Sequence, residues 1–348
     1  MIKHITVHLT NRCNLRCRYC HIDAGIHGED SVLNIEECKN IFIDTLQSVS
    51  IAGGEPFCDK ERLYAFLDII PKRITDVAIT TNGLLVNEDD LNNMHKRNVR
   101  LQISVDGKIN EHEYNRGNNT YEKTIKTIIN AVNKGIRVDV LTTVSRTNKD
   151  TLLEHIEYMD AIGVTNLTLL HFTPKGRGEG VPEEETHRIE WVQLQNELRK
   201  KIVTKNMRVW IQPRFSTYNQ LSDSERVRGI NICNMYKLEY AYVDVVDGSV
   251  YPCGLAYGTP LMMGNFRKQS LYEIINNVQN QNECPDECKE CNKVKLCRGG
   301  AKCYSWLIYG DINKKDPYCK NDNIIPICPF PAIKISGPKM KTIRPTIV

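Results

Sequence analysis

The alternation of β-branched runs with helical patterns over the first 170 residues constrains the fold more than any other feature. Short strands are expected at residues 5–9, 48–52, 76–81, 99–105, 137–144 and 166–171. Helical patterns lie between them, at residues 35–47, 60–70, 87–97, 121–134 and 149–162. Strands that alternate with amphipathic helices indicate βαβ units and a parallel sheet. These units are fewer than a closed eight-stranded barrel needs, so the pattern predicts an open, partial (β/α)6 TIM-like barrel of the α/β class.

The last third of the chain has a different character, because nine of the 14 cysteines follow residue 230. Asp247-Gly248 separates two apolar runs and predicts a β-hairpin over residues 239–251. Residues 271–278 have the pattern of a short helix. We therefore expect a small cysteine-rich domain after the barrel. The expected division is 1–212 for the barrel, 213–232 for a linker, 233–330 for the cysteine-rich domain and 331–348 for a tail.

Composition narrows the functional classes. The chain has 348 residues, 41% of them hydrophobic, which is enough for two domain cores. Its net charge is +4 and its Lys and Arg are scattered, so nothing favours nucleic acid or a membrane surface as a partner. The opening Met1-Ile-Lys-His-Ile-Thr-Val7 is typical of a strand and not of a signal peptide, which predicts a cytoplasmic protein. Cysteines in that compartment bind metals or react more often than they form disulfides.

Three cysteines directly follow the first predicted strand, with the spacing CxxxCxxC: Cys13, Cys17 and Cys20. A four-iron cluster usually takes four thiolates, so three would leave one iron open to a ligand that is not protein. A zinc site is the alternative. Zinc prefers a closed tetrahedral set built from CxxC pairs, and the sequence places no fourth ligand nearby.

This motif, with an aromatic residue (Tyr19) before its third cysteine, resembles the radical S-adenosylmethionine (SAM) family. The resemblance implies that Cys13, Cys17 and Cys20 are the catalytic cysteines and ligate a [4Fe–4S] cluster. The open iron of that cluster would hold SAM, and an electron would split the sulfonium to give a 5′-deoxyadenosyl radical. The tetrapeptide after the second strand is similar to the family's element for the methionine amino group; it consists of Gly53, Gly54, Glu55 and Pro56.

The same resemblance implies further cofactor-binding positions at the ends of later strands. Asn82 follows the third strand, and Ser104 would contact polar groups of the cofactor. Asp106 would orient a sugar hydroxyl or the substrate, with a turn cap as the alternative. Arg116 would pair with the cofactor carboxylate. Two other cysteines lie in this half: Cys38 is expected in the core, and Cys58 either in the core or as a hydrogen-atom donor.

The C-terminal cysteines resemble the SPASM domain, which adds auxiliary iron–sulfur clusters to radical SAM enzymes. Carried over by position, auxiliary cluster I would take Cys233, Cys253 and Cys303, and cluster II would take Cys288, Cys291, Cys297 and Cys319. Ala301 stands where the pattern usually has a cysteine. Cluster I would therefore have an open iron, or Cys284 or Cys328 would complete it. A zinc ribbon built from the cysteines between 284 and 297 is the alternative.

Together the two resemblances imply a radical SAM oxidase or maturase that takes hydrogen from a ribosomally made peptide. A dehydrogenase or epimerase of a sugar-like small molecule is the second hypothesis. A non-catalytic iron–sulfur electron carrier is the third, although such a carrier would not need the element at 53–56. The implied partners are the peptide or small-molecule substrate, a reductant such as flavodoxin or ferredoxin, and a separate peptide-recognition protein.

Overall fold

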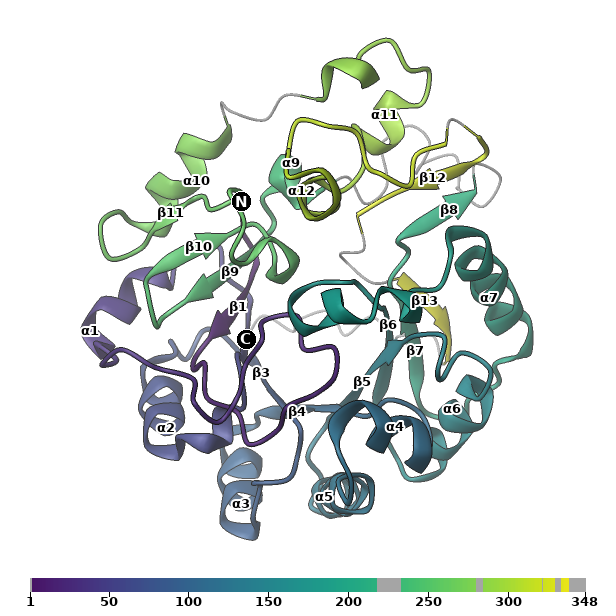
Figure 1. The fold of residues 1–348 in the computed structure, drawn as a ribbon. Helices are drawn as coiled ribbons and strands as arrows, with labels where there is room; N and C mark the ends of the chain where they lie inside the picture. The colour runs from purple at the N-terminus through teal and green to yellow at the C-terminus, as the bar shows by residue number, and fades with distance from the viewer. Residues whose placement is uncertain (1, 218–232, 280–283, 321, 329–332, 338–348) are drawn as a thin grey trace, which may run out of the picture.

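A computed structural model describes residues 2–217, 233–279, 284–320, 322–328 and 333–337. It confirms the α/β class, because seven strands from β1 to β7 run parallel in one sheet (Figure 1). These strands are β1 (His4–His8), β2 (Ser48–Ala52), β3 (Asp76–Thr81), β4 (Arg100–Ser104), β5 (Val138–Val144), β6 (Asn166–His171) and β7 (Arg208–Ile211). The six strands expected in the first 170 residues are present, and β7 follows them as a seventh parallel strand.

Helices cover the outer face of this sheet, as βαβ connections require (Figure 1). They are α2 (Lys60–Ile69), α3 (Glu88–Arg97), α5 (Tyr121–Asn133), α6 (Leu152–Ala161) and α7 (Arg188–Lys201). Apolar and polar residues alternate along most of these strands, and apolar side chains such as Val49, Ile79 and Leu101 are fully buried in the core. The carboxyl ends of the strands therefore meet at one rim, where the loops that carry the predicted site residues begin.

Two helices differ from expectation. The pattern over 35–47 gives only α1 (Ile35–Cys38) and a short 3-10 turn, because the Arg73 guanidinium takes the carbonyls of Phe42, Ile43 and Leu46 at 2.9–3.1 Å. A helix continuing to residue 47 would use the Phe42 and Ile43 carbonyls for its own hydrogen bonds. In addition, residues 109–116, which include the expected site residue Arg116 and for which no helix was expected, form helix α4 (Ile109–Arg116).

The cysteine-rich region continues the barrel sheet at the β1 edge. Strand β9 (Tyr240–Asp244) runs parallel to β1, and β10 (Ser249–Tyr251) returns antiparallel to β9 as the predicted hairpin. Strand β11 (Gly264–Asn265) completes this edge, and α10 (Leu271–Gln279) follows it. At the opposite edge, β13 (Ile333–Ser336), within the expected tail, pairs with β7. A separate pair joins β8 (Phe215–Thr217) to β12 (Ile324–Pro326).

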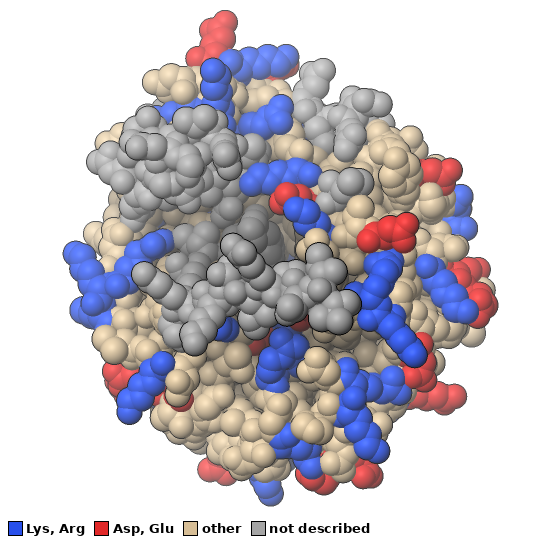
Figure 2. Space-filling model, turned by 180° about the vertical axis from the view of Figure 1, so that it is seen from behind, with Lys and Arg blue, Asp and Glu red and all other residues tan. Residues whose placement is uncertain are grey.

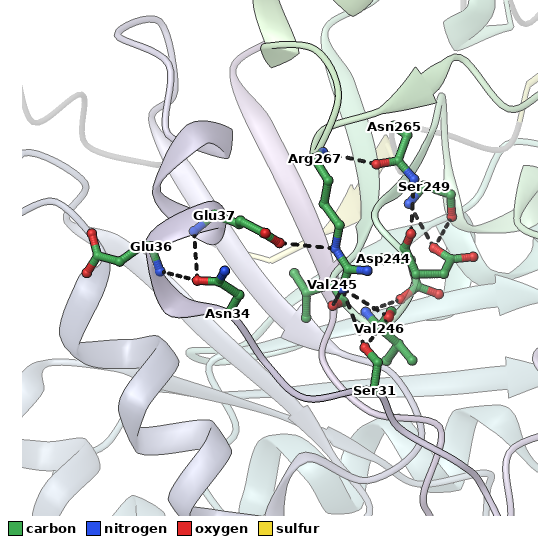
Figure 3. A network of polar contacts seen from close by, with 11 residues as sticks. Ser31, Asn34, Glu36, Glu37, Asp244, Val245, Val246, Ser249, Asn265 and Arg267 are labelled. Carbon is green, nitrogen blue, oxygen red and sulfur yellow. Dashed lines mark hydrogen bonds and ion pairs between the residues drawn. The ribbon is translucent and has the colours of Figure 1, made fainter.

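A polar network around Arg267 ties the hairpin to the N-terminal half (Figure 3). The Arg267 guanidinium donates to the carbonyls of Val245 and Val246 at 3.1 Å and forms an ion pair with Glu37 of α1 at 3.4 Å. The Ser31 hydroxyl donates to the Val246 carbonyl as well. The segment that follows the first cysteine motif is thereby fastened to the cysteine-rich region.

The surface carries both signs of charge. On the face seen in Figure 2, Lys and Arg side chains are interspersed with Asp and Glu and with uncharged residues. Among the helices that the structure describes, none combines the length and the apolar character needed to cross a bilayer.

Candidate active site

The loop between β1 and α1 brings the first three cysteines to the rim of the barrel. Cys13, Cys17 and Cys20 are free thiols, each partly exposed. The backbone N–H of Cys13 donates to the Gly25 carbonyl at 3.0 Å, so the loop folds back on itself. All three thiols therefore lie within one short loop at the carboxyl end of a central strand, where ligands bind in α/β folds.

Arg177 holds this cysteine loop from across the rim. It lies in the short 3-10 segment Gly176–Gly180 after β6, and its Nε donates to the Cys17 carbonyl at 2.7 Å. Its Nη1 donates to the Ala24 carbonyl at 2.8 Å, and its backbone N–H donates to the Cys20 carbonyl at 3.0 Å. Gly176 allows this approach, because a Cβ there would lie 2.5 Å from the Cys20 oxygen. The sequence alone did not assign Arg177 to the site, because it belongs to none of the motifs described above.

The pKa values of the thiols in this loop are consistent with a site that binds positively charged metal ions. Burial raises the pKa of Cys13 to about 12 and also raises that of Cys17, although Arg116 and Arg177 oppose the shift at Cys17. Thiols in such surroundings stay protonated until a metal supplies positive charge, and a coordinating thiol is then deprotonated. The donor set of three thiols thus fits a [4Fe–4S] cluster with one iron that the protein does not ligate.

Gly53 and Gly54 lie directly against the start of the cysteine loop. The Gly54 N–H donates to the Thr10 carbonyl at 2.6 Å, and the Glu55 N–H donates to the Arg12 carbonyl at 2.8 Å. A Cβ on Gly54 would lie 2.2 Å from the Arg12 oxygen, and Gly53 has a φ of +123° that favours glycine. Both glycines are therefore needed for two backbone segments to touch.

The Glu55 carboxylate is buried and joins the ends of two strands. One oxygen accepts from the Thr81 hydroxyl at 2.8 Å and from the Phe57 N–H at 3.1 Å, and the other accepts from the Asn82 N–H at 2.7 Å. Burial raises the pKa of Glu55 to about 7 against these three hydrogen bonds. Pro56 begins a 3-10 turn directly after it. Asn82 in turn donates from Nδ2 to Asn14 of the cysteine loop at 2.8 Å.

Asp106 and Arg116 form a buried ion pair with each other. The Arg116 Nε donates to Asp106 Oδ2, and the Thr143 N–H donates to Oδ1 at 2.9 Å. Burial opposes ionisation of Asp106, but Arg116 outweighs it and lowers the pKa of the carboxyl. The structure thus brings the two residues together near Cys17. Arg116 lowers the pKa of the Cys17 thiol, and Asp106 raises it.

The remaining predicted residues of this half have distinct places. Tyr19 is buried and meets the ring of Phe172 edge-on at 5.6 Å. Ser104 is the last residue of β4 and is half-buried. Cys38 is buried in the core. Cys58 is only half-buried, and the Asn14 backbone donates to its sulfur, so it lies beside the cysteine loop rather than inside the core.

The C-terminal thiols separate into two sets. In the first, the buried thiols of Cys233 and Cys328 are hydrogen-bonded to each other, as are those of Cys303 and Cys253. Cys303 also lies in the electrostatic range of Cys233 and Cys328, so the four form one group. The sequence left the role of Cys328 open, because spacing alone does not decide between Cys328 and Cys284.

The second set lines a pocket between α11 (Val294–Cys297) and the β12 strand. Its walls include four thiols, from Cys288, Cys291, Cys297 and Cys319. Cys284 borders this set, because its thiol is hydrogen-bonded to Cys288. No group of three or more Cys, His, Asp or Glu within the described ranges could hold a single metal ion. An iron–sulfur cluster differs from such a site in spreading its thiolates over several irons.

Comparison with known proteins identifies both halves. The profile of the radical SAM superfamily matches residues 7–159, and that of the SPASM iron–sulfur cluster-binding domain matches residues 233–304. Similar proteins include AdoMet-dependent heme synthases of Methanosarcina barkeri and Nitratidesulfovibrio vulgaris. They are 25% and 22% identical to this chain; the alignments cover 89% and 91% of it and 94% and 92% of the relatives.

Solved structures of low sequence identity share the fold. Streptococcus suis SuiB bound to S-adenosylmethionine superposes with a TM-score of 0.73 at 14% identity, covering 92% of this chain and 77% of SuiB. The enzyme anSMEcpe with bound AdoMet and a peptide superposes with a TM-score of 0.67 at 17% identity, covering 92% of this chain and 95% of that one.

The two domain profiles imply the cofactors, which are S-adenosylmethionine, the [4Fe–4S] radical SAM cluster and auxiliary iron–sulfur clusters. The thiol loop at the barrel rim and the two C-terminal thiol sets lie in the two matched regions. The chain therefore belongs to the radical SAM superfamily and carries a C-terminal SPASM domain.

Proposed function

We propose that this radical SAM enzyme abstracts a hydrogen atom from a peptide substrate and that the substrate is then oxidised or cross-linked. The observation that carries the proposal is the combination of a three-thiol loop at the barrel rim with two thiol sets in the cysteine-rich region. A single cluster would suffice to cleave S-adenosylmethionine. The additional thiol sets support a reaction in which an electron must also leave the substrate.

We assign the radical SAM cluster to the three rim thiols. When bound there, the cluster and S-adenosylmethionine supply a 5′-deoxyadenosyl radical, which removes hydrogen from unactivated carbon. Cys13, Cys17 and Cys20 are the cluster ligands, and Arg177 keeps the Cys17 and Cys20 carbonyls in place. Tyr19 and Phe172 form an apolar wall beside the loop that excludes water.

The cofactor-binding role belongs to residues around the loop. Gly53 and Gly54 let the 53–56 backbone touch the loop, and Glu55 and Pro56 fix the direction in which that backbone leaves β2. Asn82 directly follows β3, Ser104 is the last residue of β4, and both supply polar groups at the rim. Asp106 holds Arg116 through a buried ion pair, so Arg116 acts as an oriented cation beside Cys17.

In the cysteine-rich region we assign auxiliary cluster I to the set with Cys233, Cys253 and Cys303. We assign cluster II to the pocket lined by Cys288, Cys291, Cys297 and Cys319. These positions follow the order of the thiols along the chain and their grouping in space. A reductant such as flavodoxin or ferredoxin would supply the electron for cleavage.

Two structures support a peptide as the substrate class. SuiB has been solved bound to its precursor peptide SuiA, and anSMEcpe with a bound peptide, and both share the fold of this chain over 92% of its length. The heme synthases favour a second candidate, a tetrapyrrole-like small molecule, because their alignments run along both halves of the chain. In either reaction the rim residues have the same roles.

Anaerobic reconstitution with iron and sulfide, followed by reaction with S-adenosylmethionine and dithionite, tests the proposal. The wild-type protein should form 5′-deoxyadenosine, whereas the variant Cys13→Ala/Cys17→Ala/Cys20→Ala should form none and keep its auxiliary iron. Turnover by that variant would refute the site. Synthetic peptides from reading frames adjacent to the gene and a panel of tetrapyrroles then distinguish the substrates by mass spectrometry.

A further inference from the structure

We propose that Cys328 is the fourth protein ligand of auxiliary cluster I, so that every iron of this cluster is held by the chain itself. The inference rests on the proposed function, because it assumes that Cys233, Cys253 and Cys303 hold a cluster. It also decides a question about substrate binding: a cluster with four thiolates has no free iron for a substrate group.

The position of Cys328 is set by tertiary contacts. Strand β12 pairs with β8 so that Pro326 lies opposite Phe215, and the Ile327 N–H donates to the Arg214 carbonyl at 2.9 Å. Arg214 is fully buried and forms a bidentate ion pair with Asp316 at 3.0 Å. These contacts hold the residue that precedes Cys328 in one place.

The surroundings of the two candidate thiols differ. The Cys328 thiol is 3% exposed and contacts the Cys233 thiol, which is 5% exposed. The Cys284 thiol is partly exposed and contacts Cys288, a member of the other set. Cys284 stands four residues before Cys288 in the sequence. Of the two candidates, only Cys328 lies in the buried group with Cys233 and Cys303.

Two buried lysines give this group a charge balance that suits an anionic cluster. Lys175 is 7% exposed, and its Nζ donates to the Leu255 carbonyl at 3.1 Å beside Cys253 and Cys303. Lys302 is 6% exposed and lies beside Cys233. Buried ammonium groups are stable where anions neutralise them. Four thiolates on an iron–sulfur core carry a net negative charge, which the two lysines offset.

The assignment also accounts for Ala301. The usual pattern would place a ligand at that position, and Ala301 is fully buried there without a sulfur atom. Cys303, two residues later, enters the group from helix α12 (Lys302–Tyr309). Cys328, which follows β12, supplies the remaining thiol, so this ligand is positioned by the fold and not by local spacing.

The variants Cys328→Ser and Cys284→Ser form a matched pair for the test. After anaerobic reconstitution, iron and sulfide are counted and the reduced clusters are recorded by electron paramagnetic resonance. Cys328→Ser should lose one auxiliary signal, together with about two to four irons per chain, the content of one cluster. Cys284→Ser should keep the wild-type iron and signals. The assignment is overturned if Cys328→Ser matches the wild type or if Cys284→Ser loses cluster I.

A second measurement applies even if Cys328→Ser does not fold, which circular dichroism would reveal. Cyanide is added to the reduced variant that lacks Cys13, Cys17 and Cys20, so that only auxiliary clusters are observed. Unchanged signals are expected, because no auxiliary iron is open; a shifted signal from cluster I overturns the assignment. The proposed function fails separately, through the absence of deoxyadenosine from the wild-type protein.

Discussion

Arg177→Ala is the substitution whose effect on the site follows most directly from the structure. The change removes the hydrogen bonds from the guanidinium to the Cys17 and Ala24 carbonyls at 2.7 and 2.8 Å. It also removes an ion pair with Asp23, whose side chain is 66% exposed. The backbone hydrogen bond from residue 177 to Cys20 remains in the variant. The cysteine loop therefore loses the side-chain hydrogen bonds that hold it, but it keeps all three of its cysteines.

The magnitude can be worked from these contacts. A hydrogen bond from a charged donor contributes about 1.5–3 kcal/mol, and an exposed ion pair such as that with Asp23 contributes about 0–1 kcal/mol. The two carbonyl contacts at the lower value give about 3 kcal/mol. Each 1.4 kcal/mol is about tenfold in an equilibrium constant. The ordered form of the loop should therefore be disfavoured about 100-fold in Arg177→Ala.

A chelator challenge measures this loss. The brown reconstituted protein is mixed anaerobically with a ferrous chelator, and the release of the radical SAM cluster is followed by absorbance and iron content. Arg177→Ala should release that cluster at least tenfold faster than the wild type, and Arg177→Lys should fall between, because an ammonium lacks the planar fork. Arg97→Ala, which breaks a surface ion pair with Asp68, is the control. Equal rates of cluster release from Arg177→Ala and the wild type would refute the inference that the Arg177 side chain holds the cysteine loop in place.

Three further predictions concern neighbouring contacts. Gly54→Ala should lower deoxyadenosine formation about 100-fold by displacing the cysteine loop, whereas Gly25→Ala, whose Cβ meets nothing within 4 Å, should change it little. Arg214→Ala should lower unfolding stability by about 3–5 kcal/mol, because Asp316 would remain as an unpaired buried charge; a thermal midpoint equal to wild type would contradict this. Glu55, with its pKa raised from 4.5 to about 7, binds more protons in the folded than in the unfolded state between those values. Its contribution to stability, about 3 kcal/mol below pH 4.5, should therefore fall as pH rises to 7. Denaturation across this range should show a component that Glu55→Gln lacks, and identical pH profiles would contradict the assignment.

Local patterns in the sequence were enough for the strands, most helices and the motif cysteines. Six strands were predicted because runs of β-branched apolar residues are typical of buried strands. Cys13, Cys17 and Cys20 were predicted because their spacing is a local pattern within one loop. The shortened α1 was missed because Arg73, 27 to 31 residues away, binds the carbonyls near its expected end. Local propensity carries no information about such a distant donor.

The roles of individual side chains depended on contacts between distant segments. Asp106 and Arg116 were each predicted at the site, but their pairing with each other required the turn between β4 and α4 to bring them together. Arg177 had no motif of its own, because its role depends on contacts with a loop 153 to 160 residues earlier in the chain. Cysteine type and order along the chain determined that iron–sulfur chemistry belongs here. Only the pairing of β8 with β12 decided that Cys328 joins Cys233, because burial and contact are properties of the folded chain and not of local spacing.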